Sequence, residues 1–527
     1  MRFLIRPHTV GIAALALGAS VLLSRLMGLV RDKIISFYFG ASPEADVYFM
    51  AFVVPDYINY LLAGGYFSIT LVPLLTRAFQ GDEKDGWKFF STAVWWAFLS
   101  IAILTAVAMV FTKPIAHVIA PGFSEANIDR LCTFLRIILP AQVCFLPGAC
   151  FTAMLYLRKH FTAPAITPLV YNGCTILVGI IFLQLFPERG MEGFCWGVLS
   201  GAFLGSFLLP LLAVKEGGLR FQWSWRHPLM KRVIILALPL MLGQSIVVLD
   251  EQFVRIFGTL TGEGNVSLLN YARRIMLVPV GVIAQAAGLA SYPFLAALIA
   301  NKEMDAFNSH MRTTLLTTLL VAIPVSLWII TVSEPIMRLI FQQGSFTAAN
   351  AQSAGLLLTI MMGSVAFWCA QQVLGRGFYA NQDMLTPAIC GTLATIASLP
   401  LYWFGAKHFG AIGVASAGCL GIMAYTATLW VRWRWQFGTG AVTNVIKESG
   451  VTLLLCLPAA AASWFVSHNL LKYIPQGLAG AFWQIIGSGL AFALVYFAIF
   501  ALFAPRLSAP VTSMLMLFLR KARIIKG

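Results

Sequence analysis

Apolar stretches of about twenty residues recur along the whole chain, and no other feature limits its fold as strongly. About twenty helical residues cross the roughly 30 Å hydrocarbon core of a membrane. No stretch sustains the alternation that is typical of a transmembrane barrel. Only 11% of the 527 residues are charged, whereas soluble domains are about a quarter charged. The sequence therefore predicts an all-α, polytopic membrane protein with about fourteen transmembrane helices.

The distribution of basic residues predicts the orientation of these helices. An even number of spans leaves both termini on one side of the membrane. Placing them in the cytoplasm also places most Lys and Arg in cytoplasmic loops, above all in 215–232 and in the C-terminal tail. The net charge of +16 then reflects this bias and an attraction to anionic membrane lipids. Because no basic soluble domain remains, nucleic-acid binding is not expected.

An internal repeat relates the two halves of the chain. The segment PIAHVIAPGFSEAN resembles PIMRLIFQQGSFTAAN, so that Pro114 and Pro335 lie 221 residues apart and Asn127 and Asn350 lie 223 apart. An offset that stays nearly constant across six spans indicates two six-helix lobes in parallel repeat, followed by two further helices. In transporters with such repeats, substrates bind between the halves near mid-membrane.

The repeat and the charge pattern together divide the chain into four parts. These are an N-terminal lobe with helices 1–6 at 1–214, a basic cytoplasmic linker at 215–232, a C-terminal lobe with helices 7–12 at 233–434, and helices 13 and 14 with a basic cytoplasmic tail at 435–527.

The sequence contains no motif of a soluble enzyme. It has no P-loop, HExxH or GxSxG, and no segment between spans is long enough for a nucleotide-binding domain. The nine cysteines lie in apolar surroundings without CxxC spacing, which predicts packing residues and not disulfides or metal ligands. We therefore expect a protein that is not an enzyme, carries no metal or other cofactor, and acts within the membrane.

Charges inside the first span are the strongest functional signal. The stretch SRLMGLVRD carries Arg25, Arg31 and Asp32 within an apolar run. A charge at the bilayer centre costs at least about 2.5 kcal/mol, so these groups need partners or a wet cavity. Arg31 and Asp32 either line such a cavity or mark the outer end of the helix, where an arginine can snorkel. Arg25 lies deeper, and a guanidinium grips phosphate with a two-pronged fork. This predicts an anionic, phosphate-bearing substrate.

Further charges lie in later spans. Arg273 and Arg274 begin the eighth span, and because adjacent helical residues point about 100° apart, one of them is expected to face the space between the lobes. Asp46 in the second span either neutralises helix 1 or joins the site. Asp250 and Glu251 in the seventh span are candidate residues for coupling transport to an ion.

The motifs SRLMGLVRD, ADVYFMAFVVP, YARRIMLVPVGV and FQQGSFTAAN together resemble the MurJ (MviN) lipid II flippase family. This family belongs to the multidrug/oligosaccharidyl-lipid/polysaccharide exporter superfamily. The resemblance covers essentially the whole chain, including the last two helices. It implies a two-lobed, multi-pass protein of the bacterial cytoplasmic (inner) membrane with both termini in the cytoplasm. It also implies that the chain moves undecaprenyl-pyrophosphate-linked peptidoglycan precursor from the inner to the outer leaflet during cell wall biogenesis.

By this resemblance the family's substrate-binding arginines fall on Arg25, Arg31 and Arg274, and its helix 2 aspartate falls on Asp46. Asp32, beside Arg31, is included in the predicted site.

The chain departs from the family at several charged positions. Where relatives usually carry an arginine pair in helix 2, this chain has Asn59 and Tyr60, and the glutamate one turn later is Gly64. At a position in helix 8 where relatives often carry an acidic residue, this chain has Leu277. Either Arg273 supplies the missing charge, with Asn59 keeping a polar contact, or the chain carries a different lipid-linked sugar.

The expected mechanism is alternating access, with the polyprenyl tail in a groove beside helices 13 and 14, unless these are plain packing helices. Either the membrane potential or a monovalent cation drives the cycle. Membrane lipids and proteins of cell-wall synthesis are the expected partners.

Two alternative functions stay open, namely a flippase for another polyprenyl-linked oligosaccharide (O-antigen, capsule or exopolysaccharide) and a non-transporting cell-wall scaffold. A drug exporter would prefer an acidic cavity. The excess of arginine therefore argues against this function.

Overall fold

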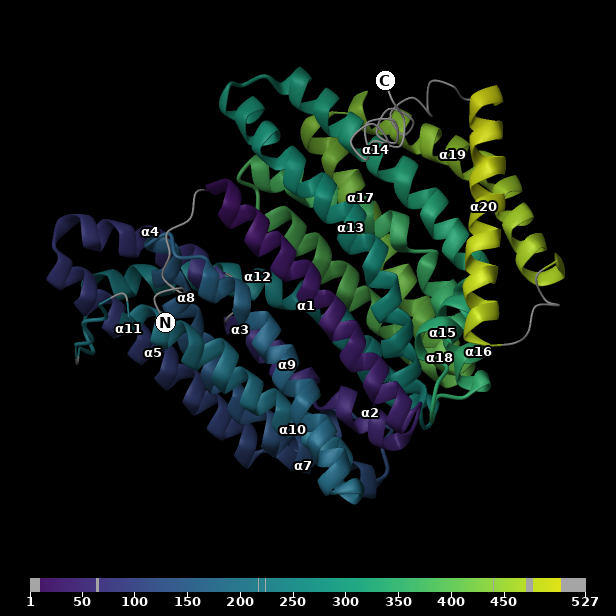
Figure 1. The fold of residues 1–527 in the computed structure, drawn as a ribbon. Coiled ribbons are helices and arrows are strands. Elements are labelled where there is room, and N and C mark those ends of the chain that lie inside the picture. The colour runs from purple at the N-terminus through teal and green to yellow at the C-terminus, as the bar shows by residue number, and fades with distance from the viewer. Residues whose placement is uncertain are drawn as a thin grey trace. The chain divides into compact units, whose positions relative to one another are not determined.

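The described part of the chain is helical throughout and contains no β-strand (Figure 1). The computed structural model describes residues 10–62, 66–216, 218–222, 224–438, 440–470 and 477–503, and it gives the backbone alone for 10–15, 60–62, 66–69, 238–250, 285–286, 289–290, 440–443 and 470. Helices satisfy their own backbone hydrogen bonds, which is what a chain needs where water is absent. The predicted all-α class is confirmed.

Packing divides the helices into two units, of which the first ends at Ser267 and the second begins at Leu268. The first unit contains α1 (Val10–Phe39), α2 (Pro43–Met50), α3 (Val53–Leu62), α4 (Tyr66–Gly81), α5 (Glu83–Val110), α6 (Thr112–Ile119), α7 (Glu125–Ile138), η2 (Leu139–Ala141), α8 (Gln142–Leu157), α9 (Thr162–Leu185), η3 (Pro187–Arg189), α10 (Gly190–Gly201), η4 (Ala202–Leu208), α11 (Leu209–Glu216), α12 (Pro228–Gly258) and η5 (Thr259–Thr261).

The second unit contains most of α13, which crosses the boundary, and the helices that follow it. These are α13 (Asn265–Ala300), α14 (Met304–Thr331), α15 (Ser333–Phe341), α16 (Ala348–Met362), α17 (Val365–Ala380), α18 (Leu385–Phe437), α19 (Gly440–Phe465), η6 (Val466–Leu470) and α20 (Leu478–Phe503).

Several of these helices can cross a membrane. Among the described residues, nine are long and apolar enough, and the bent pair α16 and α17 raises the number to ten. The 53-residue α18 holds two of the expected spans, because its backbone breaks at Gly410, where φ is 58°. The multi-pass architecture is confirmed, and the number of fourteen spans stays a prediction.

Helix α12 is grouped differently by packing and by the repeat. It packs on α3 and α4 and so belongs to the first unit, whereas the repeat assigns 233–258 to the C-terminal lobe. The four predicted parts with their boundaries stay a prediction from the sequence.

In the first unit, α9 and α10 approach each other through a row of glycines spaced four residues apart. A Cβ atom added to Gly197 would lie 2.7 Å from the Thr175 Cα, and one added to Gly201 would lie 2.7 Å from the Tyr171 carbonyl oxygen. Gly205 continues the row. Small residues of this spacing allow membrane helices to pack backbone against backbone. This contact fixes α9, on which α1 rests.

Helix α1 is held on α9 by two polar contacts. The Ser20 hydroxyl donates a hydrogen bond to the carbonyl oxygen of Ala165, and the Asn172 side chain donates one to the Ser24 hydroxyl at 3.2 Å. Positions 20, 24 and 31 share one face of a helix because four and seven residues complete about one and two turns. The face of α1 that carries Arg31 is therefore the one that packs on α9.

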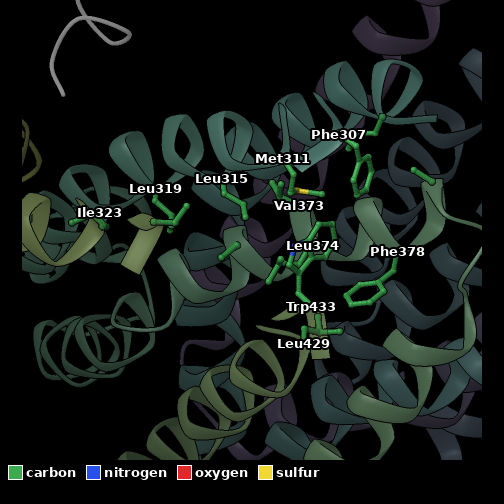
Figure 2. Close-up of a cluster of buried hydrophobic side chains, with 14 residues drawn as sticks. Phe307, Met311, Leu315, Leu319, Ile323, Val373, Leu374, Phe378, Leu429 and Trp433 are labelled. Carbon is green, nitrogen blue, oxygen red and sulfur yellow. The ribbon is translucent and has the colours of Figure 1, made fainter. Parts of the chain in front are cut away.

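A hydrophobic core of the second unit is built mainly from α14, α17 and α18, and Figure 2 shows its side chains. The rings of Phe307 and Trp433 stack at 5.6 Å between centroids, and Met311 packs beside them. A Cβ atom added to Gly377 would lie 2.1 Å from the end of the Met311 side chain. Glycine at this position therefore lets α17 pack closely against its neighbours.

Candidate functional site

Arg31 and Asp32 form a buried ion pair in α1. The Arg31 Nε and Nη2 atoms donate to Oδ1 of Asp32 at 3.1 and 3.0 Å. The side chains of Arg31 and Asp32 are 13% and 0% exposed. Tyr48 and Tyr171 lie within electrostatic range of the guanidinium. Arg31 is therefore buried beside its own counterion and does not snorkel to a helix end.

Arg25 lies on another face of the same helix. It directly follows Ser24, whose side chain contacts α9, so its own side chain points about 100° away from that contact. Its surface is exposed, as is that of its neighbour Leu26. The structure thus separates the two arginines, with Arg31 held inside the first unit and Arg25 on the surface of α1.

A second ion pair joins α3 to α12. Nη1 of Arg255 donates to Oδ2 of Asp56 at 2.9 Å and to Oε1 of Gln252 at 3.3 Å. Nη2 of Arg255 lies 3.6 Å from Oε1 of Glu251. Glu251, a predicted ion-coupling residue, thus faces a guanidinium. The side chain of Asp250 lies outside the described residues.

Sequence reasoning did not single out Arg255 as a site residue. Its pairing with Glu251 has a local signal, because residues four apart meet on a helix. Its stronger contact with Asp56 joins residues 199 positions apart, and only the packing of α12 on α3 creates it.

Asp46 binds the N-terminus of α13. Its Oδ2 accepts a hydrogen bond from the Gly264 N–H at 2.6 Å, and its Oδ1 accepts from the N–H and the hydroxyl of Ser267 at 2.7 and 2.5 Å. Asp46 is only 1% exposed. A carboxylate in this position caps the unpaired N–H groups and complements the positive end of the helix. This structural role accounts for a buried acid here, and its predicted part in substrate binding stays a prediction.

The structure describes only some of the positions at which the chain departs from the pattern of the family it resembles. Asn59 is half-buried in α3 and Leu277 is half-buried in α13, whereas the side chain of Tyr60 and the whole of Gly64 lie outside the described residues.

The second unit carries the arginines of α13. Arg273 is buried, with its guanidinium carbon 5.4 Å from the ring centroid of Trp368, and Arg274 is half-buried. Arg25 and Arg31 belong to the first unit and these two to the second. Their convergence on one cavity stays a prediction.

The arrangement of the cysteines and acids bears on metal binding. All nine cysteines are free thiols, six of them buried. In the part of the chain that the structure describes, no three His, Cys, Asp or Glu side chains come together in a way that could hold a metal ion.

Comparison with known families identifies the relationship. A family model described as "Lipid II flippase MurJ" matches residues 35–479. The chain belongs to the MurJ family. The match contains Asp46, Asn59, Arg273 and Arg274, while Arg25, Arg31 and Asp32 lie before its start.

Named MurJ proteins align with most of the chain. The probable lipid II flippase MurJ of Rhizobium meliloti (strain 1021) is 27% identical over 471 residues, which cover 86% of each chain. The lipid II flippase MurJ of Burkholderia cenocepacia is 27% identical over 460 residues, or 84% of this chain and 88% of the relative. The probable MurJ of Vibrio cholerae serotype O1 is 25% identical over 434 residues, or 79% and 82%.

Solved structures share the fold. "Lipid II flippase MurJ, inward closed conformation" has a TM-score of 0.77 at 23% identity and matches 93% of this chain and 99% of its own. An inward-facing MATE family transporter of the MOP superfamily has a TM-score of 0.68 at 13% identity, with coverage of 82% and 99%. The fold expected from the MurJ resemblance is therefore confirmed.

Proposed function

We propose that this MurJ family member is a lipid II flippase. It carries the undecaprenyl-pyrophosphate-linked peptidoglycan precursor from the inner to the outer leaflet of the bacterial cytoplasmic membrane by alternating access. Its relatives are named for this activity. The orientation with both termini in the cytoplasm rests on the distribution of basic residues.

The proposal rests on the way in which Arg31 is hydrogen-bonded to Asp32. Both of its bonds to Asp32 end on a single carboxylate oxygen and use Nε and Nη2. The remaining terminal nitrogen, Nη1, can therefore donate to a phosphate oxygen while Asp32 holds the guanidinium in place. A guanidinium fixed in this way loses little freedom on binding and suits an oxyanion. Arg25, Arg273 and Arg274 complete the proposed head-group site.

An apolar groove supports the proposed path of the polyprenyl tail. It lies between α14 and α20, has a volume of about 420 Å³, and is lined by Pro324, Trp328, Ile486, Gly489 and Leu490 among others. Helix α20 is the last of the predicted spans, so the groove lies where the tail is expected. Because an apolar lining offers nothing to a charged head group, a hydrocarbon chain is its fitting occupant.

Filling this groove is expected to impair transport. A Cβ atom at Gly489 would lie 3.2 Å from the Trp328 ring, so Gly489→Leu places its side chain in the groove. We expect clearly slower growth when this variant replaces the lipid II flippase of a depleted strain, at equal membrane abundance. Gly450→Leu in α19 is the matched control, since nothing lies within 4 Å of a Cβ there. Growth at the parental rate with Gly489→Leu would show that the groove does not hold the polyprenyl tail.

The driving force is proposed to be the membrane potential. One elementary charge crossing 100 mV gains roughly 2.3 kcal/mol, which is enough to reset a carrier with surplus arginine charge. A monovalent cation at Asp250 and Glu251 is the alternative. The contact of Glu251 with Arg255 leaves this alternative the weaker one. Membrane lipids and proteins of cell-wall synthesis are the proposed further partners.

Complementation of cells depleted of their own lipid II flippase tests the proposed function. The parent chain is expected to restore growth, whereas Arg25→Ala, Arg31→Ala and Arg274→Ala are expected to fail at normal membrane abundance. Each removes a charge from the proposed phosphate site, and a lost hydrogen bond to a charged group costs about 1.5–3 kcal/mol. Arg189→Ala in the exposed turn η3 is the control and should grow like the parent.

Two results would contradict this proposal. Full growth with all three alanine variants would show that these arginines do not hold the substrate. No growth with the parent, together with loss of capsule or O-antigen after deletion in its host, would show that another polyprenyl-linked glycan is the cargo.

A further inference from the structure

The segment between α11 and α12 lies along the first turns of α5. Its described residues within 218–227 form a strap without regular secondary structure. The Gln222 N–H donates a hydrogen bond to the Ser91 hydroxyl at 2.9 Å, and the Trp96 indole N–H donates one to the Trp225 carbonyl oxygen at 3.0 Å. These bonds fix the backbone of the strap on the surface of α5.

His227 joins the end of the strap to two helices. Its Nε2 atom lies 3.1 Å from Oδ1 of Asp85 in α5, and its Nδ1 atom accepts a hydrogen bond from the Leu229 N–H at 3.2 Å and so caps α12. The imidazole also packs on the Phe89 ring, at 4.9 Å between centroids. The strap therefore follows a fixed path along α5 from Trp96 to Asp85, which is roughly 16 Å of helix.

The middle of the strap presents aromatic rings that are only partly covered. Trp225 stacks on Trp95 of α5 at 5.4 Å between centroids, and Phe221 meets the same ring edge-on at 5.6 Å. Trp225 and Phe221 are nevertheless 39% and 43% exposed, and Trp96 beside them is 41% exposed. Rings with an apolar body and a polar edge concentrate at the boundary between membrane and water.

Exposed arginines adjoin these rings. Arg220 directly precedes Phe221 and Arg226 directly follows Trp225, and both arginines are exposed. Neither side chain takes part in an ion pair with another described residue. The chain from 215 to 232 carries five basic residues and one acid. The strap thus places unpaired positive charge beside exposed aromatic surface.

The acids at the start of α5 do not cancel this charge. Asp85 contacts His227, Glu83 accepts a hydrogen bond from the Trp87 indole N–H at 3.3 Å, and Asp82 caps α5. The same turns of α5 also carry two lysines. Around the strap, basic residues therefore outnumber acids, and the acids of α5 are already engaged within the protein.

We infer that the strap is a docking surface for anionic phospholipid at the membrane surface. The guanidinium groups of Arg220 and Arg226 pair with head-group charges, while the rings of Phe221 and Trp225 enter the boundary between head groups and acyl chains. A segment without regular structure cannot face lipid inside the hydrocarbon, because its backbone polar groups would lack partners. The strap therefore lies at the surface, where the anionic groups are.

This docking has a consequence for the fold. Because His227 both contacts α5 and caps α12, lipid that holds the strap down also holds the start of α12 against α5. The inference does not rest on the proposed function, since no transported substrate takes part in it.

Tryptic cleavage of the full-length chain in nanodiscs tests this inference. The discs contain either phosphatidylcholine alone or phosphatidylcholine mixed with phosphatidylglycerol, and peptide mass spectrometry follows cleavage after Arg220 and Arg226. Cleavage should be slower with phosphatidylglycerol, by about fivefold for each basic residue that reaches the surface. High salt should remove this protection because it screens exposed charges. Cleavage after Lys302, which is exposed in the turn before α14, is the internal reference.

A pair of matched variants tests the two arginines directly. Arg220→Gln/Arg226→Gln removes two exposed charges from the strap, and Arg189→Gln/Lys302→Gln removes two exposed charges elsewhere. Native mass spectrometry counts the phosphatidylglycerol molecules that stay bound to each purified chain. The parent and the second variant should retain equal numbers, and the strap variant should retain fewer.

Three results would overturn the inference. The first is an equal rate of cleavage at the strap in both kinds of nanodisc, or a slowing that is the same after Lys302. The second is an unchanged number of bound phosphatidylglycerol molecules in the strap variant. The third is equal protection by inorganic phosphate in discs of phosphatidylcholine alone, which would assign the strap to a free anion and not to a lipid surface.

Discussion

Arg31→Gln is expected to lower the free energy of unfolding by about 3–5 kcal/mol, because it leaves the fully buried Asp32 carboxylate without its counterion. Asp32→Asn should destabilise by a similar amount, since it leaves the guanidinium alone. The double variant Arg31→Gln/Asp32→Asn should recover much of this loss, because two neutral amides can still hydrogen-bond to each other. It should nevertheless fail to support growth of flippase-depleted cells, since the phosphate-binding charge is gone.

Denaturation with sodium dodecyl sulfate in mixed micelles measures the stability of the four proteins, and complementation measures their transport. The double variant will combine recovered stability with lost transport only if Arg31 both stabilises the fold and binds the substrate. A double variant that supports normal growth would show that Arg31 serves the fold alone. A double variant as unstable as Arg31→Gln would show that the buried pair is not the source of the destabilisation.

Asp46→Ala is expected to lower the free energy of unfolding by about 2–4 kcal/mol, the combined cost of a lost helix cap and of buried donors left unpaired. Three hydrogen bonds from Gly264 and Ser267 end on its carboxylate. Asp46→Asn should retain part of this stability because its amide oxygen still accepts. The same denaturation in mixed micelles measures the effect.

Asp82→Ala provides the matched control for this prediction. Asp82 caps α5 through one exposed hydrogen bond, from the Lys84 N–H at 3.0 Å. Because water can replace that bond, the loss should stay at about 0.5–1 kcal/mol. Equal effects of the two alanine variants would show that the buried cap contributes no more than an exposed one.

The sequence predicted those features that the membrane itself dictates. A hydrocarbon core requires helices with about twenty apolar residues, so the all-α, multi-pass architecture could be read from hydropathy. The burial cost of charge singled out Arg31, Asp32 and the arginines of α13 as positions that need a partner. The resemblance of the chain to the MurJ family was confirmed by the match over residues 35–479.

The partners of those charges could not be predicted, because they depend on contacts between distant segments. Asp46 was expected to neutralise helix 1 or to bind substrate, and it caps a helix that begins more than 200 residues later. The sequence places Arg25 deeper in the first span than Arg31, but enclosure by protein depends on the face that packs on α9, and that face carries Arg31. A hydropathy profile holds no information about which face of a fully apolar helix meets a neighbour.

The position of Asp46 has a mechanical consequence for any transport cycle. Helix α13 is clamped at its first turn by α2 of the first unit, while most of its length packs in the second. A helix that is hydrogen-bonded to one unit and packed in another must bend, or lose those hydrogen bonds, if the units move. Pro279 and Pro293 interrupt its internal bonding and provide compliant points. We therefore expect any rearrangement during transport to bend α13 at these prolines or to break the hydrogen bonds that Asp46 accepts.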